Sequence, residues 1–375
     1  MPIQDPPAEP GMSLEHVDTP ALLVDLDAYE WNIDQMAKEA ANSGMRLRPH
    51  AKTHKCAVIA LHQISHGAIG VCCQKVSEAE ALVNGGVRDI FITNEIIGRH
   101  KLTRLASLAK RATVAVCIDH RDNLEELNAV ARSSDVHVDA LVEMDVGGGR
   151  CGVEPGEPAL VLAEQVQSAS NLRFRGLQAY QGRAQHVRAY AERRSSIDKS
   201  ADAVRRTLDL LSGRGLSCDV VAGGGTGTYL FEMVSGVYNE IQPGSYIFMD
   251  ADYGRNLTDK GTEFNDFRQS LFVYTQIMSM AKSNYAVVDA GLKALAFDSG
   301  MPVPLDLPGV RYCRPSDEHG ILDLSAAPGV VSLGSKIKLI PGHCDPTVNL
   351  YDWYVAIRGN LVEALWPIVG RAALG

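Results

Sequence analysis

The sequence predicts an α/β fold in which a (β/α)8 barrel precedes an antiparallel β domain, and three observations support this. Eight short apolar runs alternate with stretches of helical length between residue 27 and about residue 250, as in a parallel sheet with helices outside it. Eight strands are also the number that closes such a barrel. After about residue 265, runs of Val, Ile, Leu and Tyr are broken by Gly and Pro, which is typical of antiparallel strands.

The barrel elements can be assigned in chain order. Stretches 27–41 and 77–84 carry charge on one face and apolar residues on the other, which predicts outer helices. The eight expected strands are 46–50, 68–74, 89–95, 112–119, 138–145, 173–180, 219–223 and 240–248.

The second domain is expected to contain strands at 269–280, 286–289, 336–340 and 351–358. Segment 16–26 is also β-like and is a candidate for pairing with them. We therefore divide the chain into an N-terminal segment, 1–26, a barrel, 27–262, and a β domain, 263–375.

Composition narrows the class of function. The chain has 375 residues, 46% of them hydrophobic, and a net charge of -9, which argues against a nucleic-acid or anionic-membrane surface and favours a small-molecule substrate. The first twenty residues lack the apolar run of a signal peptide, and no stretch approaches the ~20 apolar residues of a membrane span, so we expect a cytoplasmic protein. Eight scattered cysteines show no disulfide or zinc spacing and are expected to be reduced.

Lys52 is the first candidate catalytic residue. It follows the first expected strand, and active sites of β/α barrels lie at the carboxyl ends of the strands. Burial there would disfavour the charged amine and make it a nucleophile or Schiff-base partner. The alternative is a surface lysine in a basic loop. Other polar residues stand at or after strand ends, where helix capping is their alternative role: Gln74, Asn94, Glu95, Asp119, Asp145, Arg150 and Tyr180.

Two loops predict a phosphate site. The seventh strand runs into Gly223, Gly224, Gly225, Thr226 and Gly227, and the eighth carries Gly244, Ser245 and Tyr246. Loops after strands seven and eight often bind phosphate, because glycines let backbone N–H groups approach its oxygens. A tight turn is the alternative. Phosphate on one side and a lysine on the other indicate pyridoxal 5'-phosphate, and no Walker-type motif indicates a nucleotide.

His343 and Asp345 form a candidate metal pair in the second domain. An extended backbone would place them on one face and Cys344 on the other. Imidazole plus carboxylate suits Mn²⁺, Mg²⁺ or a similar divalent ion. A turn-capping aspartate before a proline is the alternative.

These residues resemble the fold-type III pyridoxal phosphate enzymes, within the D-threonine aldolase and D-serine dehydratase group. The resemblance covers most of the chain and rests on specific motifs: Arg48-Pro49-His50-Ala51-Lys52, Cys72-Cys73-Gln74-Lys75-Val76-Ser77-Glu78, Gly149-Arg150-Cys151-Gly152-Val153, Gln178-Ala179-Tyr180, Gly223-Gly224-Gly225-Thr226-Gly227, Asp250-Ala251-Asp252-Tyr253-Gly254 and Asp289-Ala290-Gly291-Leu292-Lys293.

The resemblance implies an alanine racemase-like barrel plus a β domain, a homodimer, and Lys52 as the Schiff-base lysine. It places Gln74, Thr226, Gly244 and Ser245 around the cofactor and Arg150 and Tyr180 near its ring. His186 is the implied base, with a metal-bound hydroxide as competitor. The dehydratases of the group typically have His-x-Cys and zinc, whereas this chain has the His-x-Asp of the aldolases.

The predicted activity is therefore a retro-aldol cleavage of a D-3-hydroxy amino acid, D-threonine or 3-hydroxy-D-aspartate, to glycine and an aldehyde. Two alternatives stay open. A dehydratase would expel the 3-hydroxyl and yield a keto acid and ammonia. A non-catalytic carrier of pyridoxal phosphate would need only the barrel.

Overall fold

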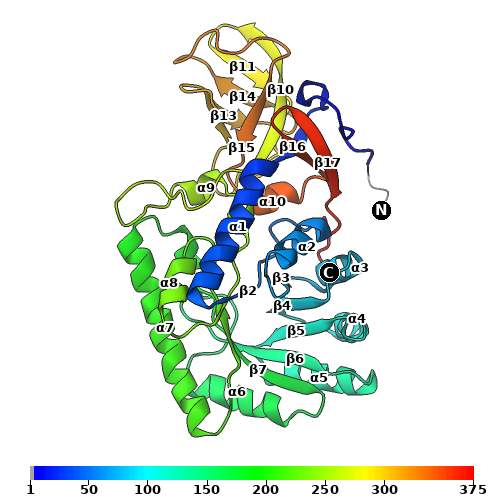
Figure 1. Cartoon of the computed structure of the whole chain (residues 1–375), viewed down its shortest axis with the longest axis vertical. Helices are drawn as coiled ribbons and strands as arrows, with labels where there is room; N and C mark the ends of the chain where they lie inside the picture. The colour runs from blue at the N-terminus through cyan, green and yellow to red at the C-terminus, as the bar shows by residue number, and fades with distance from the viewer. Residues whose placement is uncertain (1–3) are drawn as a thin grey trace.

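Eight parallel strands form the barrel in the computed structural model, which describes residues 4–375 (Figure 1). In spatial order β2 is followed by β9, β8, β7, β6, β5, β4 and β3. The barrel closes between β2 and β3, where the N–H of Ala51 donates to the carbonyl of Cys72 at 2.7 Å and the N–H of Cys72 donates to that of Pro49 at 2.8 Å. The strands are β2 (Arg46–Leu47), β3 (Val71–Cys73), β4 (Asp89–Glu95), β5 (Thr113–Ile118), β6 (Val138–Glu143), β7 (Leu172–Gln178), β8 (Val220–Gly223) and β9 (Glu240–Ile241).

Seven of the eight predicted barrel runs contain one of these strands, β4 has the predicted bounds, and β7 begins one residue before its predicted run, at Leu172. The prediction that the eighth run stays extended to residue 248 is wrong. β9 ends at Ile241, and a 3-10 helix, η3 (Ser245–Ile247), follows. Pro243 lies between them, and proline cannot donate a hydrogen bond to a neighbouring strand.

Helices separate consecutive strands and cover the barrel. The predicted stretches 27–41 and 77–84 lie inside α1 and α3. α1 begins where the Asp25 carboxylate accepts the N–H of Ala28 at 3.1 Å, and it ends at Gly44, whose φ of 68° suits glycine. The helices of this part are α1 (Leu26–Ser43), α2 (Ala57–Ser65), α3 (Val76–Asn84), α4 (Arg99–Ala109), α5 (Arg121–Ser133), α6 (Glu157–Ser168), α7 (Tyr190–Gly213) and α8 (Tyr229–Val234).

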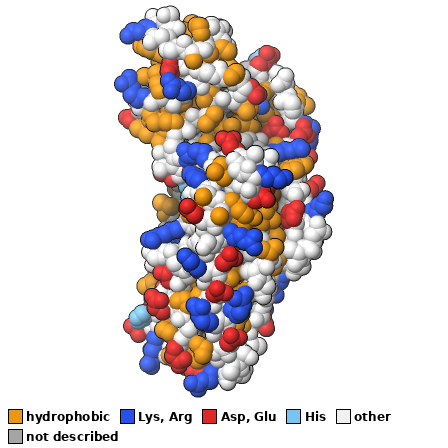
Figure 2. Space-filling model, turned by 90° about the vertical axis from the view of Figure 1, so that its left-hand side faces the viewer, with side chains coloured by type: hydrophobic (Ala, Val, Ile, Leu, Met, Phe, Trp, Pro, Cys, Tyr) orange, Lys and Arg blue, Asp and Glu red, His pale blue; other side chains and the backbone are white. Residues whose placement is uncertain are grey.

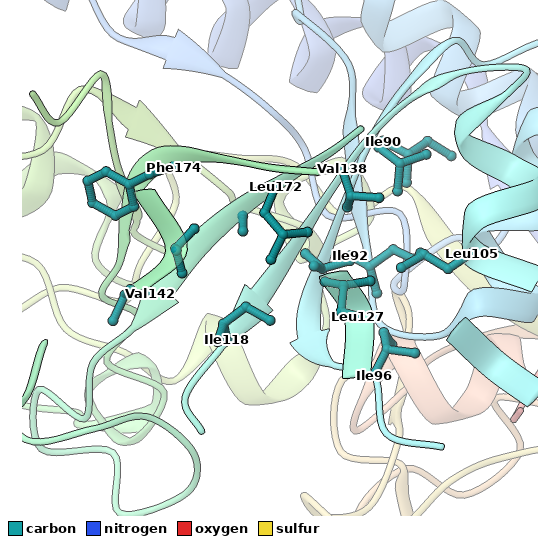
Figure 3. Close-up of a cluster of buried hydrophobic side chains, with 14 of the residues drawn as sticks. Ile90, Ile92, Ile96, Leu105, Ile118, Leu127, Val138, Val142, Leu172 and Phe174 are labelled. Atoms are coloured by element: carbon teal, nitrogen blue, oxygen red, sulfur yellow. The ribbon is translucent and has the colours of Figure 1, made fainter. Parts of the chain in front are cut away.

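Alternation along the strands creates two apolar layers. Outward residues such as Ile90, Ile92 and Val138 pack against the helices, as Figure 3 shows. Phe91 and Leu141 belong to a separate cluster that fills the barrel interior. Because successive strand residues point to opposite faces, this alternation also decides which side chains at the strand ends face the barrel mouth.

A nine-stranded sheet forms the second part of the molecule, which confirms the predicted order of a barrel followed by a β domain. β1 joins this sheet, antiparallel to β10 and parallel to β16, and all its other strand pairs are antiparallel. The strands are β1 (Ala21–Asp25), β10 (Leu271–Lys282), β11 (Tyr285–Val288), β12 (Val303–Pro304), β13 (Arg311–Pro315), β14 (Gly320–Asp323), β15 (Lys336–Ile340), β16 (Trp353–Arg358) and β17 (Leu361–Pro367).

Charge is mixed over the face drawn in Figure 2, where basic and acidic side chains alternate and neither sign forms a continuous patch. Across residues 4–375, no helix combines the length and the apolar character that a membrane span requires.

His54 should make the protein less stable in acid. It is fully buried, its Nδ1 accepts the N–H of Cys56 at 3.1 Å, and burial lowers its pKa to about 4. An unfolded histidine titrates near 6.5, so the unfolded state binds more protons as pH falls from about 6.5 to 4. We expect a loss of unfolding free energy on the order of 3 kcal/mol across this window.

Urea unfolding at a series of pH values would measure this loss. His54→Asn keeps an acceptor for the Cys56 N–H and should flatten the profile between pH 6.5 and 4. His16→Asn, at a histidine whose side chain is 67% exposed, should leave the profile unchanged. Equal slopes in the wild type and His54→Asn would contradict the assignment.

Candidate functional site

A polar cavity lies at the carboxyl ends of the barrel strands, and the structure brings together most of the residues that the sequence predicts for a cofactor site. Tyr246 lies behind the cavity, fully buried, and its hydroxyl accepts a hydrogen bond from the Gln63 amide at 2.9 Å. His186 and His343 lie outside the lining. The predicted residues that line the cavity are Lys52, Gln74, Arg150, Tyr180, Gly225, Thr226, Gly244 and Ser245.

Lys52 faces this cavity and forms an ion pair with Asp345 of the second part of the chain. Burial lowers the pKa of Lys52, but the charge of Asp345 and the hydrogen bond to it raise this pKa more, so it lies above its ordinary value. Burial therefore disfavours the ammonium as expected, but the contact with Asp345 outweighs it and reverses the net shift. The pKa of Asp345 is lowered: burial raises it, and the charges of Lys52 and His343 outweigh burial.

The predicted phosphate loops form a cradle that fits an anion. A Cβ on Gly244 would lie 2.5 Å from Thr53 Oγ1 and 3.0 Å from the His50 carbonyl, so only glycine lets the chain pass here. Thr226 Oγ1 accepts the N–H of Tyr246 at 2.9 Å and so joins the two loops. Within residues 4–375, the N–H groups of Thr226, Gly244 and Ser245 donate no hydrogen bond. These free donors fit the phosphate of pyridoxal phosphate, and the amine of Lys52 beside them fits its aldehyde.

A neutral polar wall lies beside Lys52. His50 Nε2 is 2.9 Å from the Gln74 amide nitrogen and 3.0 Å from Thr93 Oγ1. Burial and the charge of Lys52 hold the pKa of His50 well below its usual range, so its imidazole is uncharged. This wall offers hydrogen bonds without adding a second cation to the site.

Arg150 and Tyr180 both line the cavity, and the arginine lies over the tyrosine ring. The Arg150 guanidinium carbon lies 5.9 Å from the centre of the Tyr180 ring, and an Arg150 nitrogen lies 3.7 Å from Glu143 Oε1. Burial raises the pKa of Tyr180, so its hydroxyl stays protonated near neutral pH. Arg150 thus adds a cation to the cavity lining, next to an uncharged tyrosine.

The metal pair differs from its predicted geometry. His343 has an extended backbone, but α10 (Cys344–Val348) begins directly after it, so Cys344 and Asp345 are helical. Successive residues of a helix are rotated by about 100° and not 180°, and the Cys344 thiol therefore contacts Asp345 Oδ1 at 3.4 Å and does not face away from it.

The environment of His343 nevertheless fits a metal ligand. Asp298 Oδ2 lies 2.7 Å from His343 Nδ1, an arrangement that fixes the ring and leaves Nε2 for a cation. The Lys52 ammonium stands at Asp345 where a metal cation would bind. His343 Nε2 and Asp345 are the two protein ligands that this site offers.

His186 belongs to a second network at the cavity entrance. It lies on η2 (Arg183–His186), and its Nδ1 is 2.5 Å from Asp252 Oδ2. Asp252 also binds Arg188 and Arg255. The His186 ring lies 5.4 Å from the ring of Tyr253, which lines the cavity. His186 is therefore oriented by a carboxylate and lies one side chain away from the cavity.

Asp250 connects the segment that carries Asp252, the partner of His186, to the segment that carries Asp345. Its Oδ1 accepts the N–H of Tyr253 on α9 (Ala251–Gly254), and its Oδ2 accepts the N–H of Cys344 on α10, both at 2.9 Å. One buried carboxylate thereby positions the helix that carries Asp252 beside the helix that carries Asp345.

Sequence reasoning missed several lining residues. The alternation of side chains along a strand could have indicated Thr93 on β4 and Gln178 on β7. Thr93 lies two residues after inward-facing Phe91, and Gln178 lies two residues after Gly176, which pairs with inward-facing Leu141. Nothing local could have linked Asp252 to His186. The missed lining residues are His50, Thr53, Thr93, Gln178, Gln242 and Tyr253.

Comparisons with known proteins agree with this site. Residues 24–252 match the model of the alanine racemase N-terminal domain, and residues 270–357 match that of a putative serine dehydratase domain. A 3-hydroxy-D-aspartate aldolase of Paracoccus denitrificans is 46% identical, covering 98% of this chain and 95% of its own. A D-threonine aldolase of an Arthrobacter species is 43% identical, covering 98% and 96%.

A solved structure extends the similarity to three dimensions. The crystal structure of D-threonine aldolase from Filomicrobium marinum superposes with a TM-score of 0.95 at 48% identity, covering 98% of this chain and all of that one. The chain belongs to the alanine racemase-like family of pyridoxal phosphate enzymes, in its group of D-threonine and 3-hydroxy-D-aspartate aldolases.

Proposed function

We propose that this protein is an aldolase that uses pyridoxal phosphate and a divalent metal to split a D-3-hydroxy amino acid reversibly into glycine and an aldehyde. The substrate is D-threonine or 3-hydroxy-D-aspartate. The observation that carries the proposal is the contact between Lys52 and Asp345, because it joins the cofactor lysine to the metal pair at one barrel mouth.

Lys52, the glycine loops and Arg150 are the residues that would hold the cofactor. Bound there, pyridoxal phosphate supplies an electron sink for the carbanion left by cleavage of the Cα–Cβ bond. The free N–H groups of Thr226, Gly244 and Ser245 would donate hydrogen bonds to its phosphate. Gln74, Thr93 and uncharged His50 would offer hydrogen bonds to the cofactor without adding a cation.

His343 Nε2 and Asp345 would hold Mn²⁺ or Mg²⁺, which lowers the pKa of a bound hydroxyl. His186 is the proposed base for the proton of the substrate 3-hydroxyl. Its Nδ1 contact with Asp252 leaves Nε2 to accept a proton, and Asp252 stabilises the imidazolium that results.

Elimination of the 3-hydroxyl is the competing reaction, and Asp345 argues against it. A carboxylate retains a hard cation of the manganese or magnesium type, whereas a cysteine at this position would favour zinc. A carrier without catalysis would need neither the metal pair nor the His186–Asp252 contact.

Product analysis tests the proposal. With D-threonine or 3-hydroxy-D-aspartate, pyridoxal phosphate and Mn²⁺, we expect glycine and the matching aldehyde in equal amounts, and little pyruvate from D-serine. Amino-acid chromatography, an aldehyde assay and an ammonia assay would be run on the same samples. Ammonia released without glycine would assign the protein to the dehydratases.

Asp252→Asn tests the base. The substitution removes the charge that orients and stabilises His186, so we expect kcat to fall by about 10²–10⁴-fold with a small change in KM. Steady-state kinetics over a pH series would measure both. Asp122→Asn, at a carboxylate whose side chain is 86% exposed, is the control. An unchanged kcat in Asp252→Asn would show that another group removes the proton.

A further inference from the structure

Three carboxylates converge at the barrel mouth on the side of β4, β5 and β6. Glu95 lies opposite Cys117 in the strand register, and Cys117 lies opposite Leu141. Cys117 and Leu141 face the barrel interior, so Glu95 faces it too. Asp119 follows Cys117 by two residues, directly after the end of β5, and Glu143 follows Leu141 by two residues at the end of β6. Both therefore face the same barrel mouth.

Two of these carboxylates are not satisfied. Glu143 has a side chain that is only 6% exposed, and within residues 4–375 its Oε2 and Glu95 Oε1 have no hydrogen-bond partner. A buried carboxylate has to be paired with a cation or to coordinate one.

The opposite end of the same barrel shows how carboxylates are balanced when no cation is needed. Asp89 lies 2.5 Å and Glu240 lies 3.0 Å from Arg48, and Asp139 lies 2.6 Å from Arg173. Each of these three carboxylates thus has an arginine partner at hydrogen-bond distance.

No such balance exists at the carboxyl end. Among residues 4–375, the one cation paired with the three carboxylates is Arg150, and its nitrogen is 3.7 Å from Glu143 Oε1. Asp119 accepts only the N–H of Gly152, at 3.1 Å. The cluster therefore carries uncompensated negative charge.

Cys151 completes a set of metal ligands. One oxygen of Glu95, one of Asp119 and the sulfur of Cys151 all lie within 4.8 Å of one another, and in residues 4–375 this is the only such group of three. We propose that Glu95, Asp119 and Cys151 bind a zinc-type divalent cation, separately from the His343 and Asp345 pair. The thiolate selects a softer ion here than the imidazole and carboxylate do there.

Binding at this site would couple to the cofactor cavity through Arg150. The cation replaces the thiol proton of Cys151, which goes to solvent as the sulfur–metal bond forms. Cys151 adjoins Arg150, so the ion would hold the loop from which Arg150 reaches the cavity.

Zinc binding to the cofactor-loaded protein tests this site. The protein would be stripped with a chelator, incubated with Zn²⁺ alone, desalted and analysed for metal. His343→Ala/Asp345→Ala removes the other site, and this variant should retain one zinc per chain. Adding Cys151→Ser should weaken retention at least about 10-fold, while adding Cys313→Ser, at an exposed cysteine, should not.

A second measurement needs no substitution. In the wild-type protein, Zn²⁺ should protect Cys151 from iodoacetamide and leave alkylation of Cys313 unchanged, as followed by peptide mass spectrometry. Absence of zinc from the His343→Ala/Asp345→Ala protein, or zinc retention that Cys151→Ser does not affect, would overturn the site. In the first case Glu95 and Glu143 share a proton instead.

Discussion

Lys52→Ala should abolish turnover and the visible absorbance of the lysine-bound cofactor. Within residues 4–375, Lys52 is the only lysine that lines the cavity, which it shares with the glycine cradle, and its amine contacts Asp345. Loss of a covalent catalytic group lowers kcat by roughly 10⁴-fold or more. Absorbance spectra and steady-state kinetics on the purified variant would measure both effects.

A matched control and a rescue separate chemistry from folding. Lys55→Gln changes a nearby lysine that lies 3.7 Å from Glu78, and it should keep both the absorbance and most of the activity. A small primary amine added to Lys52→Ala should restore part of the rate, because it can replace the missing amine in the cavity. A folded Lys52→Ala protein that keeps the lysine-bound absorbance would show that another lysine holds the cofactor.

Removal of the metal should have the second largest effect. A chelator should lower turnover by at least about 10²-fold, because a metal contributes several kcal/mol to stabilising charge on the substrate oxygen. The visible absorbance should stay nearly unchanged, since the phosphate cradle belongs to the barrel loops and not to α10. Mn²⁺ or Mg²⁺ without added zinc should restore the rate, which distinguishes this metal from one at Cys151.

Variants of the pair assign the effect to its residues. His343→Ala should lose restoration by Mn²⁺, and Asp298→Ala should raise the required Mn²⁺ concentration about 10–100-fold, because Asp298 orients the imidazole. Asp345→Cys should shift the preference towards zinc. His319→Ala, at an exposed histidine of the same domain, is the control. Full turnover by a chelated protein with no bound metal would mean that His343 and Asp345 have a structural role.

Local patterns in the sequence were sufficient for the barrel and for one side of the site. Strand alternation and turn chemistry act over a few residues, so eight runs, Lys52 after the first strand and the glycine loops near the last two could all be recognised. The same short range explains one error, because no neighbour in sequence shows that α10 begins directly after His343. The early end of β9 could have been recognised, because Pro243 is a local signal against a continued strand.

Contacts between distant residues were decided by the tertiary structure alone. Lys52 meets Asp345 across 293 positions, and this contact raises the pKa of the lysine that burial alone would have lowered. His186 finds Asp252 66 positions away, and Asp298 finds His343 45 positions away. Such charges act through space, and their distances depend on how the barrel packs against the second sheet, which no pattern along the chain records.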